Sequence, residues 1–281
     1  MFRNIAIVTD STCDLPTELL VAHCISVIPQ KILWNSVIFR EGVELSSAEF
    51  YHYLASSSDL PVTQPPSPAE FAAHFEQARA YTRADRVVAL LLSSRLSQSF
   101  VNAQLAAREL DFPVFVLDTQ TVSLALGFAV LAAAEARDRG ARVEQILDAA
   151  RQTRRQTRLF FTVDTLDYLY RGGRIGGARH LIGTALSIKP ILTVAGGQVE
   201  PVENVRSRPR AVQRMLELAA NGANGALRVG VTHGNVAGEA QALLDHIISR
   251  WQPRQVVLSA TSPAIGAHTG PGVLSITVSP A

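Results

Sequence analysis

Cysteine is scarce in this sequence, and the two that occur form no recognisable motif. Cys13 and Cys24 are the only cysteines among 281 residues, no Cys-x-x-Cys pair is present, and no histidine stands at zinc-finger spacing. A disulfide framework or a structural zinc site needs more such residues at closer spacing. We therefore expect two free thiols in a reducing compartment, no metal site and no cofactor.

The sequence also lacks a long apolar run, an export signal and an excess of charge. The longest apolar run, residues 122–134, contains Ser123 and falls short of the roughly 20 residues of a membrane span. Residues 1–4 lead directly into apolar residues 5–8, without the apolar core or cleavage site of a signal peptide. The net charge is only +2, which gives no field that argues for nucleic acid. We expect a cytoplasmic protein with no nucleic-acid partner and at most transient contact with a membrane surface.

Length and hydrophobic pattern predict an α/β protein of two domains. A chain of 281 residues is long for one compact core and suits two. Near-continuous apolar runs at residues 5–9, 87–92 and 114–117 are typical of a Rossmann-like, mostly parallel sheet covered on both faces. These runs end in Asp10-Ser11-Thr12, Ser93-Ser94 and Asp118-Thr119. Because ligands bind at the carboxyl ends of parallel strands, we expect the three endings to line one crevice.

Two predicted helices begin close to these polar residues. Ser67-Pro68-Ala69-Glu70 combines an N-cap serine, a proline at the first helical position and a glutamate three residues after the cap. Thr63 then lies just upstream of a helix N-terminus, where an anion is favoured. A second helix, from about Ser97 to Leu110, follows Ser94. The alternative for Thr63 and Ser94 is that they only cap these helices.

The alternation of predicted strands and helices starts again after a charged helix at about residues 141–158. We therefore place the boundary between an N-terminal α/β domain, residues 1–158, and a C-terminal α/β domain, residues 159–281. The arginines of this helix form a solvated face or meet an acidic partner; they are Arg151, Arg154, Arg155 and Arg158. In the second domain, strands are predicted at residues 185–194, 228–234 and 256–259, with a hairpin partner at 199–202 and a turn at 266–272.

A glycine-rich stretch, residues 171–177, interrupts the helical pattern of the second domain. It lacks the Lys-Ser/Thr of a phosphate-binding loop and does not follow a strand, so a nucleotide site is the weaker interpretation. We interpret it as the stop of one helix and the start of another, which lets Arg171 and Arg174 project at the surface.

Six motifs, in order, resemble the DegV family from end to end. The sequence is identified as a member on Ile7-Val8-Thr9-Asp10-Ser11-Thr12-Cys13-Asp14-Leu15-Pro16, Thr63-Gln64-Pro65-Pro66-Ser67-Pro68, Ser93-Ser94-Arg95-Leu96-Ser97, Arg171-Gly172-Gly173-Arg174-Ile175, Ile188-Lys189-Pro190-Ile191-Leu192 and Gly266-Ala267-His268-Thr269-Gly270-Pro271-Gly272. Cys13, Gln98 and Gly176 depart from the usual family pattern, and Gln98 bears on the loop over the head group.

The resemblance implies a fatty-acid-binding protein without catalytic turnover of its own. Such a protein buries a long-chain fatty acid between its two α/β domains and presents the carboxylate to a partner fatty acid kinase of the dihydroxyacetone-kinase type, which forms an acyl phosphate. Carried over by motif, Thr63, Ser93 or Ser94, and His268 contact the carboxylate. The residues that face the phosphate or the kinase are Arg171, Arg174 and Arg206.

Two enzymatic alternatives remain open at this point. A substrate-binding domain like that of dihydroxyacetone kinase would use His233 or His268 to bind a carbonyl. A Ser-His-Asp hydrolase would use Ser94, His268 and either Asp10 or Asp118, although the sequence lacks the Gly-x-Ser-x-Gly elbow.

Three further residue assignments are open as well. Asp10 and Asp14 either order the loop after the first strand or accept a phosphoryl group. His268 is alternatively a core histidine bonded to the backbone. The apolar helix that contains Leu124 and Phe128 either lines the acyl channel or packs on the sheet.

Overall fold

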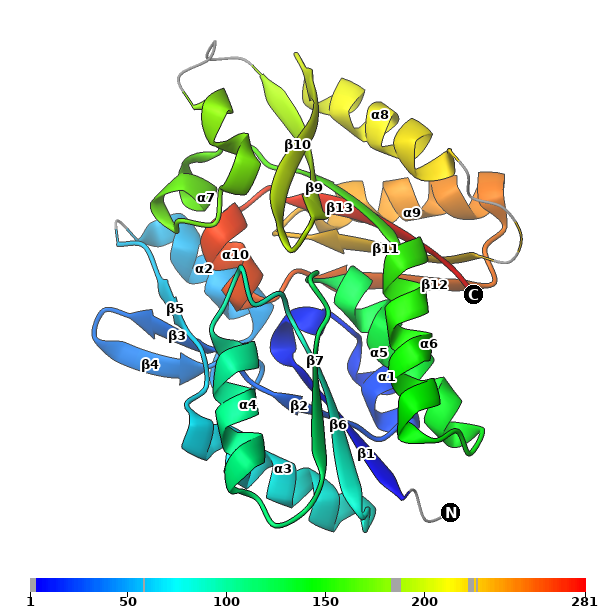
Figure 1. The fold of residues 1–281 in the computed structure, drawn as a ribbon. Helices are drawn as coiled ribbons and strands as arrows, with labels where there is room; N and C mark the ends of the chain where they lie inside the picture. Colours follow the sequence, from blue (N-terminus) through cyan, green and yellow to red (C-terminus); the bar gives the residue numbers. More distant parts are fainter. Residues whose placement is uncertain (1–3, 58, 183–187, 222–224, 226) are drawn as a thin grey trace.

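The fold is α/β, as the sequence predicts, and it is built on two large sheets and one small one (Figure 1). The computed structural model describes residues 4–57, 59–182, 188–221, 225 and 227–281. Figure 1 shows the two large sheets at opposite ends of the molecule, with helices on their outer faces and between them.

The N-terminal sheet is parallel throughout, with the strand order β2-β1-β6-β7. Its strands are β1 (Ile5–Asp10), β2 (Ile25–Ile28), β6 (Arg86–Leu91) and β7 (Val114–Asp118). Every residue of β1 is buried, which is the pattern expected of a central parallel strand, whereas the edge strand β7 is half-buried. One face is covered by α3 (Pro68–Thr82) and α4 (Ser99–Glu109), the other by α1 (Thr17–Ala22), α5 (Leu124–Asp138) and α6 (Val143–Gln156).

The C-terminal sheet is mostly antiparallel, with the order β10-β9-β8-β13-β11-β12. Its strands are β8 (Arg158–Thr162), β9 (Lys189–Ala195), β10 (Gln198–Val205), β11 (Leu227–His233), β12 (Gln255–Ala260) and β13 (Leu274–Pro280). Only β11 and β12 pair in parallel. The outer face packs on α8 (Arg208–Ala220) and α9 (Ala237–Trp251). The predicted hairpin of β9 and β10 is confirmed, and residues 185–187 of the predicted strand lie outside the described residues.

A small antiparallel sheet, β4-β3-β5, was not expected from the sequence. It consists of β3 (Lys31–Trp34), β4 (Val37–Arg40) and β5 (Val62–Gln64), and α2 (Ser47–Ser56) packs beside it. Asn35 and Ser36 both have positive φ, of 49° and 65°, which is the geometry of a tight two-residue hairpin turn. Thr63 therefore lies on a strand, because β5 pairs with β3 before the capped start of α3.

Four short helical segments complete the described fold. They are η1 (Ser11–Cys13), α7 (Asp167–Arg171), η2 (Gly176–Leu181) and α10 (Pro263–Thr269). The break between α7 and η2 confirms the predicted helix stop and restart. The prediction of a plain turn at residues 266–272 was wrong: Pro263 begins a helix that ends only at Gly270, where φ is +72°.

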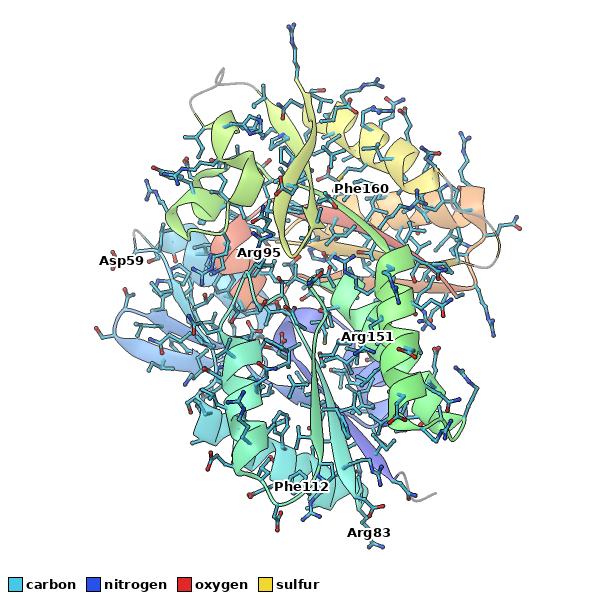
Figure 2. All side chains as sticks on the ribbon, in the orientation of Figure 1. Asp59, Arg83, Arg95, Phe112, Arg151 and Phe160 are labelled. Atoms are coloured by element: carbon cyan, nitrogen blue, oxygen red, sulfur yellow. The ribbon has the colours of Figure 1, made fainter. Side chains whose placement is uncertain are left out.

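The charged helix α6 makes more internal contacts than a solvated face requires. Arg154 donates to the carbonyls of Thr119 and Gln120, and Arg158, at the start of β8, donates to the carbonyls of Leu218 and Ala219. Arg151, labelled in Figure 2, is exposed on α6 and forms an ion pair with Asp148 of the same helix. Two of the four arginines therefore serve the fold, which weakens the argument for an acidic partner at this helix.

Helix α5 lies between the two large sheets and contacts β1 and β6 on one side and β11 and β13 on the other. Gly230 of β11 allows this packing, because a Cβ atom there would lie 2.3 Å from Cδ1 of Leu124. The division into residues 1–158 and 159–281, which we propose as the two domains, falls at the start of β8, immediately after α6.

Gly127 and Gly238, both helical glycines, provide a test of this packing. A Cβ atom at Gly127 of α5 would lie 2.5 Å from the Cys13 carbonyl oxygen, whereas one at Gly238 of α9 meets nothing within 4 Å. We expect Gly127→Ala to lower the free energy of unfolding by about 1–3 kcal/mol. Gly238→Ala should raise it by up to about 1 kcal/mol. Urea unfolding measures both, and equal effects of the two substitutions would contradict the described contact.

Candidate ligand-binding site

A cavity lies between the two large sheets and draws its lining from both halves of the chain. Its empty space, which includes a part open to solvent, amounts to about 800 Å³. Most of its wall is apolar, formed by Leu92, Leu96, Val122, Leu159, Phe161, Leu169, Val194, Val199, Ile265 and Val273. Such a cavity suits a largely apolar ligand held by a few polar contacts.

Thr63 and His268, predicted together as carboxylate ligands, meet at the cavity wall. Thr63 comes from β5 and His268 from the last turn of α10, and Oγ1 of Thr63 lies 2.9 Å from Nε2 of His268. The structure therefore brings together two predicted site residues that are 205 positions apart.

His268 is half-buried, and its surroundings favour the neutral ring. Removal from water and, to a smaller extent, the positive charge of Arg174 together lower the pKa of His268 to about 4. Nδ1 of His268 has no hydrogen-bond partner among the described residues. The ring packs against Gly172, where a Cβ atom would lie 2.1 Å from Nδ1. Position 172 must therefore be glycine for the ring to stay where it is.

Arg174 does not project at the surface as predicted, but lines the cavity. Its Nε donates to the Leu96 carbonyl at 3.1 Å and its Nη1 donates to the Gly172 carbonyl at 2.6 Å. These two carbonyls turn the guanidinium inward, beside His268. Arg171 and Arg206 are both exposed, at the end of α7 and just after β10.

Ser93 and Ser94 are not among the residues that line the cavity. The buried Ser93 hydroxyl donates to the Gly197 carbonyl at 2.6 Å, and the exposed Ser94 hydroxyl donates to the Asp118 carboxylate at 2.5 Å. Arg95 points toward the same β9–β10 turn and donates to the Gly196 carbonyl (Figure 2). The loop after β6 is thus turned toward the hairpin, and Ser97 is the serine of this motif that reaches the cavity.

Several other polar residues of the cavity wall received no ligand contact in the sequence analysis, although Thr12 was expected among the strand endings that line one crevice. They are Thr12, Gln30, Ser97, Ser123, Thr232, Thr261 and Ser275. Thr12 and Ser123 belong to loops that join across the end of the sheet, where the Ser123 amide donates to the Thr12 carbonyl. The expectation that strand endings gather in one crevice was the available signal, since Thr12 follows β1 directly.

Asp10 orders these strand endings, as one of the two interpretations of this residue proposed. Its carboxylate accepts hydrogen bonds from the Thr12 amide and hydroxyl and from the Leu92 amide, at 3.0, 2.5 and 2.8 Å. Burial raises the pKa of Asp10, and these hydrogen bonds offset part of that effect. All its described partners hold the loops after β1 and β6 in place.

The hydrolase hypothesis finds no assembled triad. Ser94 bonds to Asp118 and not to His268, whose Nε2 faces Thr63 instead. His233, the other candidate for carbonyl binding, lies at the end of β11 and does not line the cavity.

Helix α5 also contributes no residue to the cavity wall, so its apolar faces pack on the sheets.

The described residues contain neither a cluster of potential metal ligands nor a helix suited to span a membrane. Nowhere in the described part of the chain do three or more His, Cys, Asp or Glu side chains gather in a way that could hold a metal ion. No helix within these residues combines the length and the apolar character needed to cross a membrane.

The fold and the site define the class of this protein. It is an α/β protein with a cavity between two sheets and a Thr–His pair in the cavity wall. The family described as "Uncharacterised protein, DegV family" matches residues 4–281. A DegV domain-containing protein of Streptomyces coelicolor is 40% identical over 281 residues, covering 99% of each chain. The chain therefore belongs to the DegV family, as the six motifs indicated.

Solved structures agree with this assignment. A DegV family protein from Thermus thermophilus, described as fatty acid binding, matches with a TM-score of 0.92 and 32% identity, covering 99% of this chain and 100% of that one. DegV from Bacillus subtilis, described as a fatty acid binding protein, matches with the same TM-score, identity and coverage. The predicted fold class is thereby confirmed.

The low pKa of His268 gives a direct test of the site. The unfolded chain binds more protons than the native one between about pH 4 and pH 6.5, so His268 costs stability as the pH falls through that window. We expect the ring carbon resonances of His268, assigned by their loss in His268→Gln, to titrate in NMR spectra with a midpoint near pH 4. A midpoint near the ordinary value of about 6.5 would mean that the ring is solvated.

Proposed function

We propose that this protein binds a long-chain fatty acid in the cavity and presents its carboxylate to a partner fatty acid kinase, without catalytic turnover of its own. The observation that carries the proposal is the apolar cavity with the half-buried Thr63–His268 pair in its wall. The descriptions of the T. thermophilus and B. subtilis relatives as fatty acid binding support the same ligand class.

The acyl chain supplies the affinity in this proposal. Burying about sixteen methylenes at roughly 0.8 kcal/mol each gives on the order of 12 kcal/mol, before the loss of translational, rotational and chain freedom is subtracted. The apolar side chains from both halves provide the matching surface, including Leu159, Val194 and Val199.

The carboxylate supplies the orientation. A buried carboxylate is costly unless it accepts hydrogen bonds. Thr63 and His268 are the donors that we assign to it, and Arg174 places a positive charge next to them. From the motif of Ser93 and Ser94 we assign the third hydroxyl to Ser97, because Ser97 lines the cavity and the other two serines do not.

The fatty acid site can be tested by extraction and by titration. Protein purified from an expression host should release a fatty acid on denaturation, seen by mass spectrometry. Thr63→Val and His268→Ala should each weaken palmitate binding by about ten- to a hundredfold, since a charge-assisted hydrogen bond contributes roughly 1.5–3 kcal/mol.

Ser94→Ala is the matched control for these two variants, because it removes an exposed hydroxyl that does not line the cavity. It should bind palmitate as the native protein does. No bound fatty acid, together with no binding of added palmitate, would remove the proposed function.

Arg171 and Arg206 are the residues we assign to the kinase-facing surface, since both are exposed. Arg174 leaves this group, because it lines the cavity. Arginine recognises phosphate and acidic surfaces through its planar donors. We expect Arg171→Ala and Arg206→Ala to slow acyl phosphate formation by a fatty acid kinase at least about tenfold, with palmitate affinity unchanged.

Arg250→Ala, at an exposed arginine in the last turn of α9, is the control and should leave the phosphorylation rate unaltered. Loss of palmitate affinity in Arg171→Ala or Arg206→Ala would contradict this assignment.

A further inference from the structure

Helix α10, which carries His268, is held at its start by two buried carboxylates from distant parts of the chain. The Ser262 amide donates to Oδ1 of Asp14 at 3.0 Å, and the Ala264 amide donates to Oε2 of Glu41 at 2.6 Å. Pro263 between them has no amide hydrogen. The amides of Ser262 and Ala264 are therefore satisfied by side chains from the N-terminal half.

Glu41 joins α10 to the sheet that carries Thr63. It directly follows β4, and its own amide donates to the carbonyl of Gln30, which precedes β3. In the same sheet, β3 pairs with β5, so that Ile32 faces Thr63. The contact between Glu41 and Ala264 thus fixes α10 relative to β5, the two elements that supply the Thr63–His268 pair.

Asp14 joins α10 to a second part of the cavity wall. Its Oδ2 accepts a hydrogen bond from the Ser123 hydroxyl at 2.7 Å. Ser123 lines the cavity and has a φ of +60°, a conformation that costs energy in a residue other than glycine. One carboxylate therefore holds both Ser123 and the first residue before α10.

Neither carboxylate has a positive partner among the residues that the structure describes. Asp14 and Glu41 are 5% and 2% exposed, and no described Arg, Lys or His forms an ion pair with either. The titratable groups that influence them or are influenced by them are Asp10 of β1, Cys13 of η1 and Tyr51 of α2. A buried carboxylate without a counter-charge is costly, so these two residues do not contribute to the stability of the fold through their charge.

We propose that Asp14 and Glu41 are positioning residues for the carboxylate site: they hold α10 so that His268 meets Thr63 and both can bind the ligand's head group. The proposal rests on the proposed fatty acid function. Their role lies in the acceptor oxygens, which hold two amides and one hydroxyl in fixed places, and not in their charge.

If the acceptor oxygens matter and the charges do not, the stability of the protein should change with pH in a defined direction. Burial raises the pKa of Asp14 to about 7 and that of Glu41 to about 8, so above about pH 4 the native state keeps protons that the unfolded chain has lost. Stability should therefore fall as the pH rises towards 8, and between pH 6.5 and 8 His268 does not oppose this trend. Glu41→Gln keeps an acceptor oxygen and removes the charge, so it should melt at a higher temperature than the native protein at about pH 8.5.

The main test compares two ligands that share a tail and differ in the head group. We expect Glu41→Met, which keeps the volume and removes the acceptor, to weaken palmitate binding at least about tenfold and to leave the affinity for hexadecanol within about twofold. Glu41→Gln should bind both ligands as the native protein does. Met215→Ala, on the buried face of α8, is a destabilised control that should change neither affinity.

A double-variant cycle then tests whether the effect passes through His268. In the His268→Ala background, Glu41→Met should weaken palmitate binding by less than about twofold, because the group that it positions is already missing. If Glu41→Met does not fold, Asp14→Ala takes its place in both experiments, since Asp14 accepts the neighbouring amide.

The outcomes separate the two proposals. Native protein that binds neither palmitate nor hexadecanol refutes the fatty acid function itself. If the native protein binds palmitate, either of two results overturns only the positioning role. The first is that the variants lose palmitate and hexadecanol affinity equally. The second is that their loss of palmitate affinity adds to the loss caused by His268→Ala. Failure of both Glu41→Met and Asp14→Ala to fold, beside a stable Glu41→Gln, would also overturn it, because the acceptors would then serve the fold as a whole.

Discussion

A carboxylate can stay inside an apolar cavity only if hydrogen bonds replace the water that it loses, and the proposed site depends on this requirement. The Thr63–His268 pair can meet it because β5 and α10, far apart in the chain, lie side by side. Gly172 leaves room for the imidazole, and removal from water, together with the charge of Arg174, keeps that ring neutral. A neutral ring donates a proton from one nitrogen and accepts at the other.

Local sequence signals predicted the parts of the fold that depend on local chemistry. The apolar runs of β1 and β6, the capping box of Ser67 and Glu70 and the β9–β10 hairpin all follow from side-chain patterns within a few residues. The rule for parallel sheets placed three strand endings in one crevice, but only the first of them, through Thr12, reaches the cavity wall, while Ser93-Ser94 and Asp118-Thr119 do not. The six motifs identified the family, which the comparisons confirmed.

Long-range contacts determine the features that the sequence left open or predicted wrongly. Whether Ser94 or Ser97 faces the cavity depends on bonds to Asp118 and to the β9–β10 turn, and neither is visible in a serine-rich motif. The direction of Arg174 depends on the carbonyl of Leu96, which belongs to the other half of the chain. Helix α10 escaped prediction because its first amides are capped by Asp14 and Glu41 instead of by a neighbouring side chain.

The place of α5 between the two sheets sets how far the halves can move independently. Because β1 and β6 press on one side of this helix and β11 and β13 on the other, separating the sheets would expose apolar surface on both sides at once. Such a shared element couples the two cores into one cooperative unit. A hinge motion that swings the halves apart is therefore costly, and a ligand would pass in and out by local displacement of a short segment at the cavity, such as the β9–β10 turn.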